Sequence, residues 1–411
     1  MWRTHRKQRL RENALMNFKS FEEKTEKAIS EMRNAKIKEI NLIHHVDADA
    51  LSAAAITKTC LEREGYKVLT LCLEKMYPEV IESIHSTKGK IIFYTDIGSS
   101  HADCISKCNK SKNLTVILDH HDPTEATDPK VYDLNLEHYG YRGETDFSGS
   151  TSAYLFAAAL NEKNKDLAPL ALVGSSEIPQ GFLGINKSIL DEALKSGILT
   201  AKGKQLHITK LNISVNSLFS ALQVLGPVGY YTGGPELGIK ACIDGLTPEI
   251  KNELEKLENN RKAANKKLLS KLYREGINET ENIQWFDSEN IYRGMGSKVI
   301  GTFCSFLSYQ TRIIKPHKYI IGFTNMSPEI PGWGKLKENF VKASIRIPKD
   351  MQKLIDQKQV PSAVSLLIEA SKGFGVADGH LYAANVVLPV DKKEVLITNA
   401  EKVINAFKAS T

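Results

Sequence analysis

Short apolar runs alternate with helix-forming segments from about residue 38 onward, and this alternation restricts the chain to a few architectures. Strand-like runs fall at residues 37–43, 66–73, 90–96 and 113–121, with segments rich in helix formers between them. Strand–helix–strand repeats of these lengths are typical of βαβ units and a parallel sheet. The sequence therefore predicts an α/β fold class, with a parallel sheet in a first domain that covers residues 38–190.

The chain that follows this domain changes character three times. Residues 222–246 contain six glycines and two prolines, which predicts forced turns, so residues 191–246 are expected to be an irregular glycine-rich segment completing the first domain. Residues 247–277 predict one long connector helix, with Thr247 as its cap, Pro248 in its first turn and Gly276 at its end. A second, smaller α/β domain is expected over residues 283–395, and a C-terminal helix over residues 396–411.

Residues 1–37 predict an N-terminal helical arm rich in Lys, Arg and Glu. Two interpretations stay open for it: a basic arm that binds a partner or nucleic acid, and a peripheral helix that packs on the domain. The formal net charge of +7 permits a polyanionic partner but does not by itself distinguish the two.

Several classes of protein are excluded by composition. No apolar run approaches the roughly 20 residues that a membrane span needs, and the basic first residues lack the apolar stretch of a secretory signal. The six cysteines are scattered, with one helical pair at Cys104 and Cys108 that no second pair answers. A disulfide framework or zinc cluster is therefore not expected. The scattered cysteines favour a reducing compartment, so we expect a cytoplasmic location.

Acidic residues and histidines follow three of the predicted strands. Because ligands of an open parallel sheet bind beyond the carboxyl ends of its strands, these side chains should converge on one site. A single aspartate in such a place is usually a helix cap, but clustered carboxylates repel each other unless a cation offsets their charge. A mixture of Asp and His suits manganese, with magnesium as the harder alternative. The residues are Asp47, Asp49, Asp96, Asp119, His120 and His121.

These segments carry a family resemblance. "VDADALSA", "YTD" and "LDHH" resemble the first three motifs of the DHH phosphoesterase superfamily, to which RecJ-type nucleases belong, and "SGSTSAYLFAAALN" with "LALVGSSEI" resembles the fourth region. "VKASIRIP" and "GFGVADGHLYAANVVLP" resemble the associated C-terminal domain, and "VGYYTGGPELGI" resembles a segment of archaeal RecJ-like proteins, including the GINS-associated nuclease. The resemblance covers about residues 38–390. It implies a DHH catalytic domain joined by the long helix to a smaller substrate-binding domain.

The resemblance also implies a two-metal site, with Mn²⁺ preferred and Mg²⁺ as the alternative. Its ligands would be His45, Asp47, Asp49, Asp96 and His120, with Asp96 bridging the two cations. Asp119 would ligate a cation or orient the imidazoles, and His121 would contact the scissile phosphate or ligate. His44 should point the opposite way from His45 if the strand continues.

The substrate's phosphates would be bound from the second domain. The resemblance implies Arg346 and His380 for this role, with Gly379 beside them. Lys342 and Lys372 are expected to contact the sugar-phosphate backbone of the nucleic acid. Base stacking and local packing are both open for Tyr230, Tyr231 and Tyr382.

Three positions depart from the family pattern. Ala50 stands where a glycine usually follows the Asp-x-Asp motif. Glu177 stands one position early for the last metal aspartate, so its longer arm would shift the cation. Asp378 lies within the glycine triplet before His380, which puts the type of substrate in question.

The leading prediction is a metal-dependent exonuclease for single-stranded DNA or RNA that acts in DNA replication and repair or in RNA turnover. One alternative is a phosphodiesterase for small substrates, namely short oligonucleotides, cyclic dinucleotides or nucleotide 3′-phosphates. The other is a non-catalytic scaffold beside GINS and MCM in replication. The six acids and histidines of the three motifs are all present, which argues against an inactive scaffold, and binding to GINS is compatible with activity.

Overall fold

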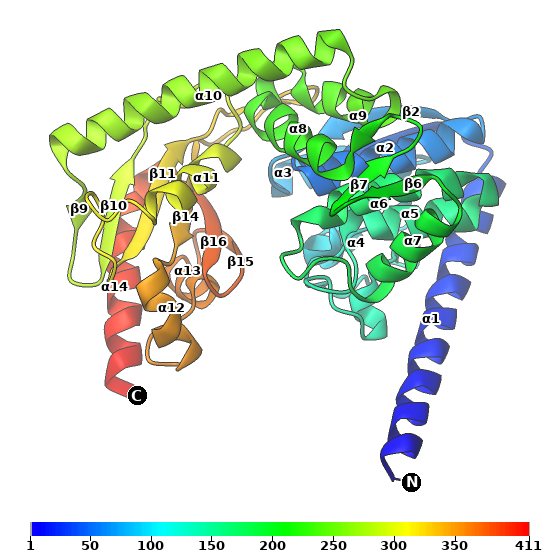
Figure 1. The fold of residues 1–411 in the computed structure, drawn as a ribbon, viewed down its shortest axis with the longest axis horizontal. Helices are drawn as coiled ribbons and strands as arrows, with labels where there is room; N and C mark the ends of the chain where they lie inside the picture. Colours follow the sequence, from blue (N-terminus) through cyan, green and yellow to red (C-terminus); the bar gives the residue numbers. More distant parts are fainter. Residues whose placement is uncertain (1, 411) are drawn as a thin grey trace. The chain divides into compact units, whose positions relative to one another are not determined.

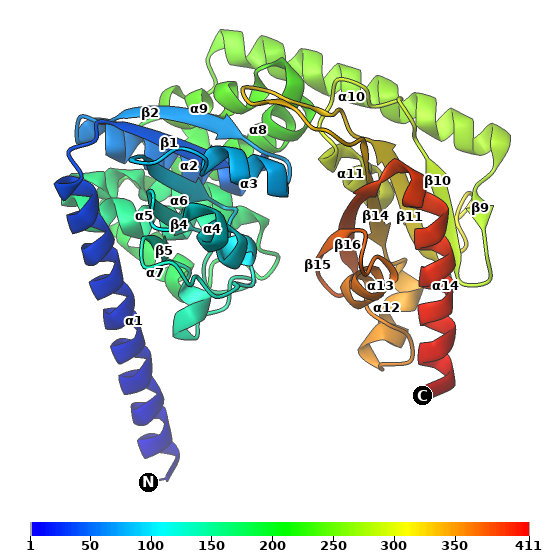
Figure 2. The ribbon, with the colours of Figure 1, turned by 180° about the vertical axis from the view of Figure 1, so that it is seen from behind.

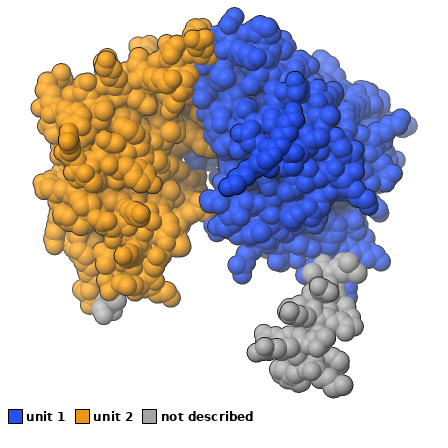
Figure 3. Space-filling model, in the orientation of Figure 1, with its two compact units in different colours: residues 1–226, 233–254 blue, residues 227–232, 255–411 orange. Residues whose placement is uncertain are grey.

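The computed structural model describes the backbone of residues 2–410 and the side chains of residues 16–409. The chain forms two compact units, coloured separately in Figure 3. Unit 1 comprises residues 1–226 and 233–254, and unit 2 comprises residues 227–232 and 255–411. The predicted α/β class, with a parallel-sheet domain and a smaller second unit that has its own sheet, is confirmed.

The core of unit 1 is a five-stranded sheet in which every neighbouring pair is parallel (Figure 1). The strand order is β2-β1-β3-β4-β5, so the chain reverses its direction of travel across the sheet at β1. The central strands β3 and β4 are buried along their whole length, as expected for strands covered on both faces. The strands are β1 (Glu39–His44), β2 (Lys67–Cys72), β3 (Ile91–Thr95), β4 (Leu114–Leu118) and β5 (Val131–Asp133).

The register of this sheet aligns the carboxyl ends of its central strands. His44 pairs with Thr95, and Thr95 pairs with Leu118, so the last residues of β1, β3 and β4 lie side by side. The residues that follow these three strands therefore emerge at one edge of the sheet, as the sequence predicts.

Unit 1 contains ten helices that begin between residues 2 and 248. They are α1 (Trp2–Asn34), α2 (Ala48–Arg63), α3 (Pro78–Ile84), α4 (Ala102–Asn109), α5 (Gly149–Leu160), α6 (Ala168–Gly174), α7 (Gly184–Lys195), α8 (Val215–Val228), α9 (Gly234–Asp244) and the start of α10 (Pro248–Glu275). Helix α2 packs against α5, α6 and α9. Its run of small buried residues, Ala53, Ala54 and Ala55, lets those helices approach closely.

The prediction of an irregular segment over residues 191–246 is wrong. The structure forms an antiparallel sheet of β6 (Leu199–Lys202), β7 (Gln205–Ile208) and β8 (Ile213–Ser214), followed by helices α8 and α9. The glycines serve close packing as well as turns. A Cβ atom at Gly226 would lie 1.8 Å from the carbonyl oxygen of Val46, and one at Gly238 would lie 2.6 Å from Cδ1 of Leu51.

The predicted connector helix is confirmed as α10, and the boundary between the two units falls within it. The hydroxyl of Thr247 accepts a hydrogen bond from the amide of Ile250, and Pro248 occupies the first turn. Gly276 follows the helix with a left-handed φ of +79°, a conformation that glycine adopts without strain.

Unit 2 has a mixed six-stranded sheet in the order β15-β16-β14-β11-β10-β9. Alternate residues of β14, Val341, Ala343 and Ile345, enter the core with helices α13 and α14, and Figure 2 shows α14 lying across the sheet. The strands are β9 (Asn278–Glu279), β10 (Ile283–Asp287), β11 (Tyr319–Asn325), β14 (Phe340–Arg346), β15 (Val376–Gly379) and β16 (Ala383–Pro389), with a separate hairpin of β12 (Glu329–Ile330) and β13 (Gly334–Lys335). The helices are α11 (Lys298–Leu307), α12 (Lys349–Asp356), α13 (Ala363–Ala370) and α14 (Lys393–Ser410), which begins three residues earlier than predicted.

The described part of the N-terminal arm packs on unit 1. In α1, Phe21, Ala28, Ile29 and Met32 are buried, and the helix contacts α5 and the strands β4 and β5. Packing is therefore established for this half, whereas the side chains of the basic residues 1–15 lie outside the described part. None of the helices in the described chain has the length and apolarity that crossing a membrane requires.

Candidate metal centre

The carboxyl edge of the sheet in unit 1 gathers three overlapping groups of side chains suited to a metal ion. In each group the ligand atoms lie within 4.8 Å of one another. Asp96 and His120 each belong to two of the groups, so two neighbouring cation positions could share Asp96. The groups are His45 with Asp47 and Asp96, Asp49 with His120 and Glu177, and Asp96 with His120 and His121.

Asp47 begins helix α2 and faces His45. One oxygen of its carboxylate accepts the amide of Ala50 at 3.1 Å as a helix cap, and the other lies 3.1 Å from Nδ1 of His45. Ala50 is buried within α2, in a backbone conformation open to any residue, so replacing the family's glycine leaves this geometry intact.

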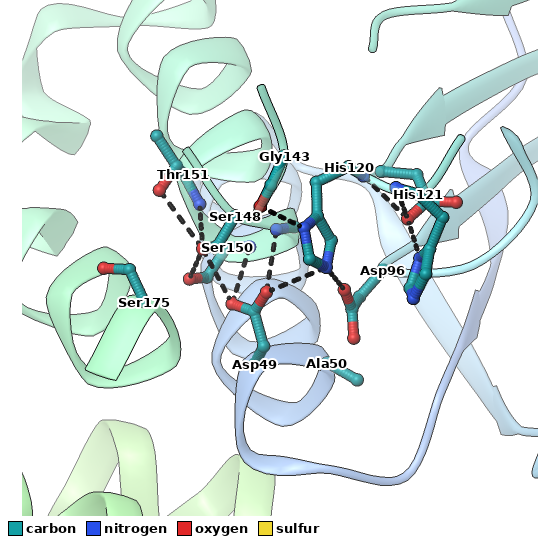
Figure 4. A network of polar contacts seen from close by, with 12 residues as sticks. Asp49, Ala50, Asp96, His120, His121, Gly143, Ser148, Ser150, Thr151 and Ser175 are labelled. Carbon is teal, nitrogen blue, oxygen red and sulfur yellow. Dashed lines mark hydrogen bonds and ion pairs between the residues drawn. The ribbon is translucent and has the colours of Figure 1, made fainter. Parts of the chain in front are cut away.

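Asp49 lies in the first turn of α2 and is fully buried, and its side chain meets the N-terminus of α5 (Figure 4). Its carboxylate accepts the amides of Gly149 at 2.8 Å and Ser150 at 3.0 Å, and the hydroxyl of Ser148 at 3.0 Å. These three donors, two of them amides at a helix N-terminus, hold the carboxylate in a fixed orientation.

Asp96 belongs to two of the metal-compatible groups and is in an unfavourable state. Its φ of +55° is in the left-handed region, and its buried Oδ1 has no hydrogen-bond partner, with Nε2 of His120 at 3.3 Å. Burial, followed by the charges of Asp49 and Asp47, raises the pKa of Asp96 well above its usual value. A divalent cation would relieve both the repulsion and the missing contact, so the residues fit a metal.

His120 is oriented for ligation by its backbone neighbour. Its Nδ1 donates to the carbonyl oxygen of Gly143 at 2.9 Å, so Nε2 is the nitrogen that would bind a cation. Nε2 then faces Asp96 at 3.3 Å and Asp49 at 3.8 Å. Histidines that bind metals ordinarily donate their other N–H to a carbonyl or carboxylate in this way.

Asp119 has both carboxylate oxygens engaged by hydrogen bonds. Oδ2 accepts the amide of Ser99 at 2.9 Å, and Oδ1 accepts the amide of His120 and Nδ1 of His121, each at 2.7 Å. Burial alone would raise the pKa of Asp119, but the charge and hydrogen bond of His121 hold it well below its usual value. Asp119 belongs to none of the three metal groups, and of the two expected roles its contacts favour orientation.

The structure places Glu177 among the metal-compatible groups and His44 outside them. Glu177 ends the short 3₁₀ turn Ser175–Glu177 after α6 and still reaches the group of Asp49 and His120. Its longer arm therefore compensates for its early position. His44 is buried, its Nδ1 lies 2.7 Å from the carbonyl oxygen of His45, and it belongs to none of the groups.

Three glycines that contact the candidate ligands were missed in the sequence. A Cβ at Gly143 would lie 2.0 Å from the carbonyl oxygen of His120, one at Gly149 would lie 2.4 Å from Oδ1 of Asp96, and one at Gly174 would lie 2.1 Å from Oδ1 of Asp49. Gly149 opens α5 and Gly174 ends α6, and helix ends are ordinary places for glycine. The sequence therefore carried no signal of these contacts.

Comparison with known proteins finds a family match for the segment that contains most of these residues. Residues 39–175, which include the candidate ligands from His45 to His121, match the model of the DHH family, N-terminal domain. Residues 39–175 are a DHH-family domain. A search of curated protein sequences found no match.

Solved structures extend the likeness beyond the DHH domain. RecJ of Thermus thermophilus in complex with Mn²⁺ is 17% identical with a TM-score of 0.64, over 94% of this chain and 55% of that chain. An exonuclease RecJ bound to manganese is 18% identical with a TM-score of 0.57, over 94% of both chains. A DHH domain from a member of a family of ribosomal proteins is 14% identical with a TM-score of 0.61, over 95% of this chain and 92% of that one. The chain therefore has a RecJ-like fold, and it spans about half the length of the Thermus protein.

Outside the DHH domain, Arg346 is the most distinctive of the expected substrate residues. It ends β14, and its guanidinium bonds the hydroxyl of Ser305 and the carbonyl of Ile345, each at 2.8 Å. Burial lowers the pKa of Arg346, and no carboxylate among the described residues offsets its charge. A largely buried cation without an anion is costly and suits an anionic ligand.

The other expected substrate residues of unit 2 differ in exposure. Lys342 is buried, with an exposed fraction of 6%, whereas His380 is exposed at the hairpin between β15 and β16. Gly379 has a φ of +141° and its Cβ position lies 2.4 Å from Cα of Ala384, so only glycine fits there. Asp378 is exposed opposite Asn385.

The aromatic residues and Lys372 complete the expected set. Tyr230 is buried and packs edge-on against Tyr231, which favours local packing over stacking on a base. The hydroxyl of Tyr382 hydrogen-bonds Asp356, and Lys372 is exposed after α13.

Proposed function

We propose that this protein is a metal-dependent phosphodiesterase that degrades single-stranded nucleic acid from an end. The observation that carries the proposal is the pair of adjacent metal-compatible groups that share Asp96. Two cations a few ångströms apart are the usual apparatus of phosphodiester hydrolysis. The RecJ-like fold, which in the compared structures binds manganese, agrees with this reaction class.

The cation pair would have mixed ligation by carboxylates and imidazoles. His45, Asp47 and Asp96 would hold one cation. His120, which groups with Asp96 and His121 and also with Asp49 and Glu177, would hold the other. Such a set favours Mn²⁺, with Mg²⁺ as the harder substitute. When bound, the cations supply a hydroxide nucleophile and neutralise the charge that develops on the phosphate.

The chain's own residues would orient the substrate around that centre. His121 is half exposed, and its Nδ1 donates to Asp119. When the ring carries a proton on both nitrogens, its Nε2–H can donate to a phosphate oxygen while Asp119 holds the ring in a fixed orientation. In unit 2, Arg346 would bind a phosphate and His380 would assist it.

A small-substrate phosphodiesterase is the second candidate, and Asp378 is the observation that favours it. This exposed acid lies two residues before His380, where a long polyanion would meet more repulsion than a dinucleotide, which carries fewer phosphates. Replication, repair or RNA turnover, and a complex with GINS, belong to the first candidate as its expected settings.

The test is an assay with single-stranded DNA and RNA, labelled separately at each end, in the presence of Mn²⁺ or Mg²⁺. We expect stepwise shortening from one end with Mn²⁺, reduced by at least a thousandfold in the Asp119→Ala, His120→Ala double variant. Asp103→Ala, which removes a surface acid of α4 paired with Lys107, should retain full activity.

The alternatives give distinct results in the same assay. Cleavage confined to oligomers of two to five nucleotides, or to cyclic dinucleotides, would identify the small-substrate enzyme. Intact substrates at every pH and with either cation, together with binding to GINS, would establish the scaffold instead.

A further inference from the structure

The hydrogen bonds that hold Asp49 continue into the interior of unit 1. Ser148 Oγ, which donates to Asp49, lies 3.2 Å from Oγ1 of Thr151, and that hydroxyl is hydrogen-bonded to the side chain of Asn186. All four residues are completely buried. Figure 4 shows Ser148 and Thr151 on the side of Asp49 that faces away from His120.

Asn186 is in the first turn of α7, directly after the loop that follows Glu177. Its amide donates to the carbonyl of Asp146 at 3.1 Å, which anchors the start of the helix. Residues 178–183 thus run between a candidate ligand, Glu177, and the inner end of the chain of hydrogen bonds. Asp49 and Glu177 belong to the same metal group, so both are connected to Asn186.

Counting hydrogens assigns a direction to this chain of bonds. The single hydroxyl hydrogen of Ser148 points to Asp49, so Ser148 Oγ is the acceptor in its contacts with the backbone amide of Thr151 at 3.3 Å and with the hydroxyl of Thr151 at 3.2 Å. If the hydroxyl of Thr151 instead donates to Oδ1 of Asn186, the hydrogen bond from Thr151 to Ser148 Oγ is lost. Nδ2 of Asn186 is then also buried without an acceptor.

A half-turn of the Asn186 amide about its terminal bond removes this conflict. Nδ2 then donates to Thr151, Thr151 donates to Ser148, and Ser148 donates to Asp49, so every hydrogen points toward the carboxylate. The cost moves to an unpaired carbonyl oxygen, which is less unfavourable than an unpaired buried donor.

We propose that Thr151 and Asn186 are positioning residues that set the affinity of the cation held by Asp49, His120 and Glu177. They act through Ser148, whose hydroxyl they orient toward Asp49, and through the anchored start of α7. The inference rests on the proposed function only in that the cluster must bind two cations. Partners that orient metal ligands typically change metal affinity by about 10–100-fold.

The test is titration of the metal-free full chain with Mn²⁺, followed by calorimetry and by electron paramagnetic resonance of the bound ion. We expect Thr151→Val to lower the affinity for one of the two cations by at least tenfold and to leave the affinity for the other unchanged. Thr151→Ser, which keeps the hydroxyl, should restore the affinity. Thr57→Val is the matched control, because the Thr57 hydroxyl is also fully buried but has no hydrogen-bond partner.

A second variant guards against a folding defect. Asn186→Ala should lower the affinity for the same cation. The metal-free variant should still show a cooperative thermal unfolding transition, which shows that it is folded. Equal affinities for wild type and Thr151→Val, or equal weakening of both cations, would overturn the inference. Two cations bound with the predicted pattern but no hydrolysis would overturn the proposed function alone, and a wild type that binds no Mn²⁺ would overturn both.

Discussion

At the scale of single residues, Asp96 carries two costs at once. A non-glycine residue in the left-handed region is strained by about 1–3 kcal/mol, although Asp and Asn tolerate it best. Its buried carboxylate oxygen also lacks a hydrogen bond. Costs of this kind persist in folded proteins where a ligand later offsets them, and here the neighbouring acids identify that ligand as a cation.

Replacing Asp96 by Asn should separate metal binding from folding. Asn keeps the left-handed backbone and removes the charge, so metal-free Asp96→Asn should be at least as stable as metal-free wild type. Mn²⁺ at 100 times its Kd should stabilise wild type by about 2.7 kcal/mol and the variant not at all. Thermal melts with and without Mn²⁺ measure both effects, and an unchanged Mn²⁺ response in the variant would contradict the bridging role.

A methyl group at Gly149 should damage the centre without a change of charge. In Gly149→Ala the new Cβ would meet the Asp96 carboxylate at 2.4–2.8 Å, so the carboxylate must shift and Mn²⁺ affinity should fall by roughly tenfold or more. Gly238→Ala is the control for overpacking, since its Cβ meets Leu51. That variant should lose about 1–3 kcal/mol of stability while keeping its Mn²⁺ affinity. Similar affinities in both variants would refute the role of Gly149.

At the scale of elements, a buried histidine joins three parts of unit 1. His85 caps α3, its Nδ1 lies 3.0 Å from Asn109 at the end of α4, and its Nε2 lies 3.0 Å from the hydroxyl of Tyr94 in β3. Burial lowers the pKa of His85 from 6.5 to about 4. The folded protein therefore holds this imidazole neutral at a pH where the unfolded chain would bind a proton.

This shift predicts a loss of stability on acidification. The contribution of His85 is fully present above pH 6.5, the unfolded value, and is lost as the pH falls toward 4. Over that range wild type should lose up to roughly 3 kcal/mol more than His85→Gln, measured by urea unfolding at several pH values. His44 also has a pKa of about 4 but is present in both proteins, so it cancels in the difference. Parallel pH profiles would contradict the assignment.

Much of the element pattern could be read from the sequence because it is local. The strands of the first sheet and helix α10 follow from apolar periodicity, caps and terminal glycines. Helices α8 and α9 could not be predicted in this way, because Gly226 and Gly238 resemble turn signals until their close neighbours, Val46 and Leu51, are known. The spacing between two helices is a property of the folded chain.

In the candidate site too, local features were predictable from the sequence and contacts between distant positions were not. Acids that directly follow strands were predictable, because the ends of neighbouring parallel strands meet at one edge. The contacts made by Ser148 and Ser150 with Asp49 were not, since they join positions about a hundred residues apart. Nothing near Asp49 in the sequence indicates which helix N-terminus will hold it.

At the scale of the whole molecule, the residues of the proposed nuclease activity are divided between the two units. The metal-compatible cluster belongs entirely to unit 1, and Arg346 belongs to unit 2. Each function can therefore be removed without the other. The contrast between them is one of charge: an excess of buried carboxylates in one unit, and a buried guanidinium without a carboxylate in the other.

Arg346→Met should impair substrate binding and spare metal binding. Methionine fills part of the same volume without the desolvation cost, so the stability of the variant should match or slightly exceed that of wild type. Its affinity for single-stranded nucleic acid should fall by at least tenfold, and the salt dependence should lose about 0.7 of a unit in slope, as expected for one phosphate contact. Filter binding over a range of salt measures both, with the exposed Arg312→Met as the matched control. Equal losses in the two variants would exclude a specific role for Arg346.

The ligands from His45 to Glu177 are separated by 132 positions (177 − 45). Contacts at such a distance form late, because closing a long loop is entropically unfavourable until the intervening sheet exists. A cation is therefore captured by a nearly native unit and cannot act as a template for its folding. A newly made chain would pass through a metal-free stage with unneutralised acids, exposed to proteases. If the proposed function holds, the supply of the divalent cation should thus govern how many copies of the protein survive in a cell, in addition to how fast each copy works.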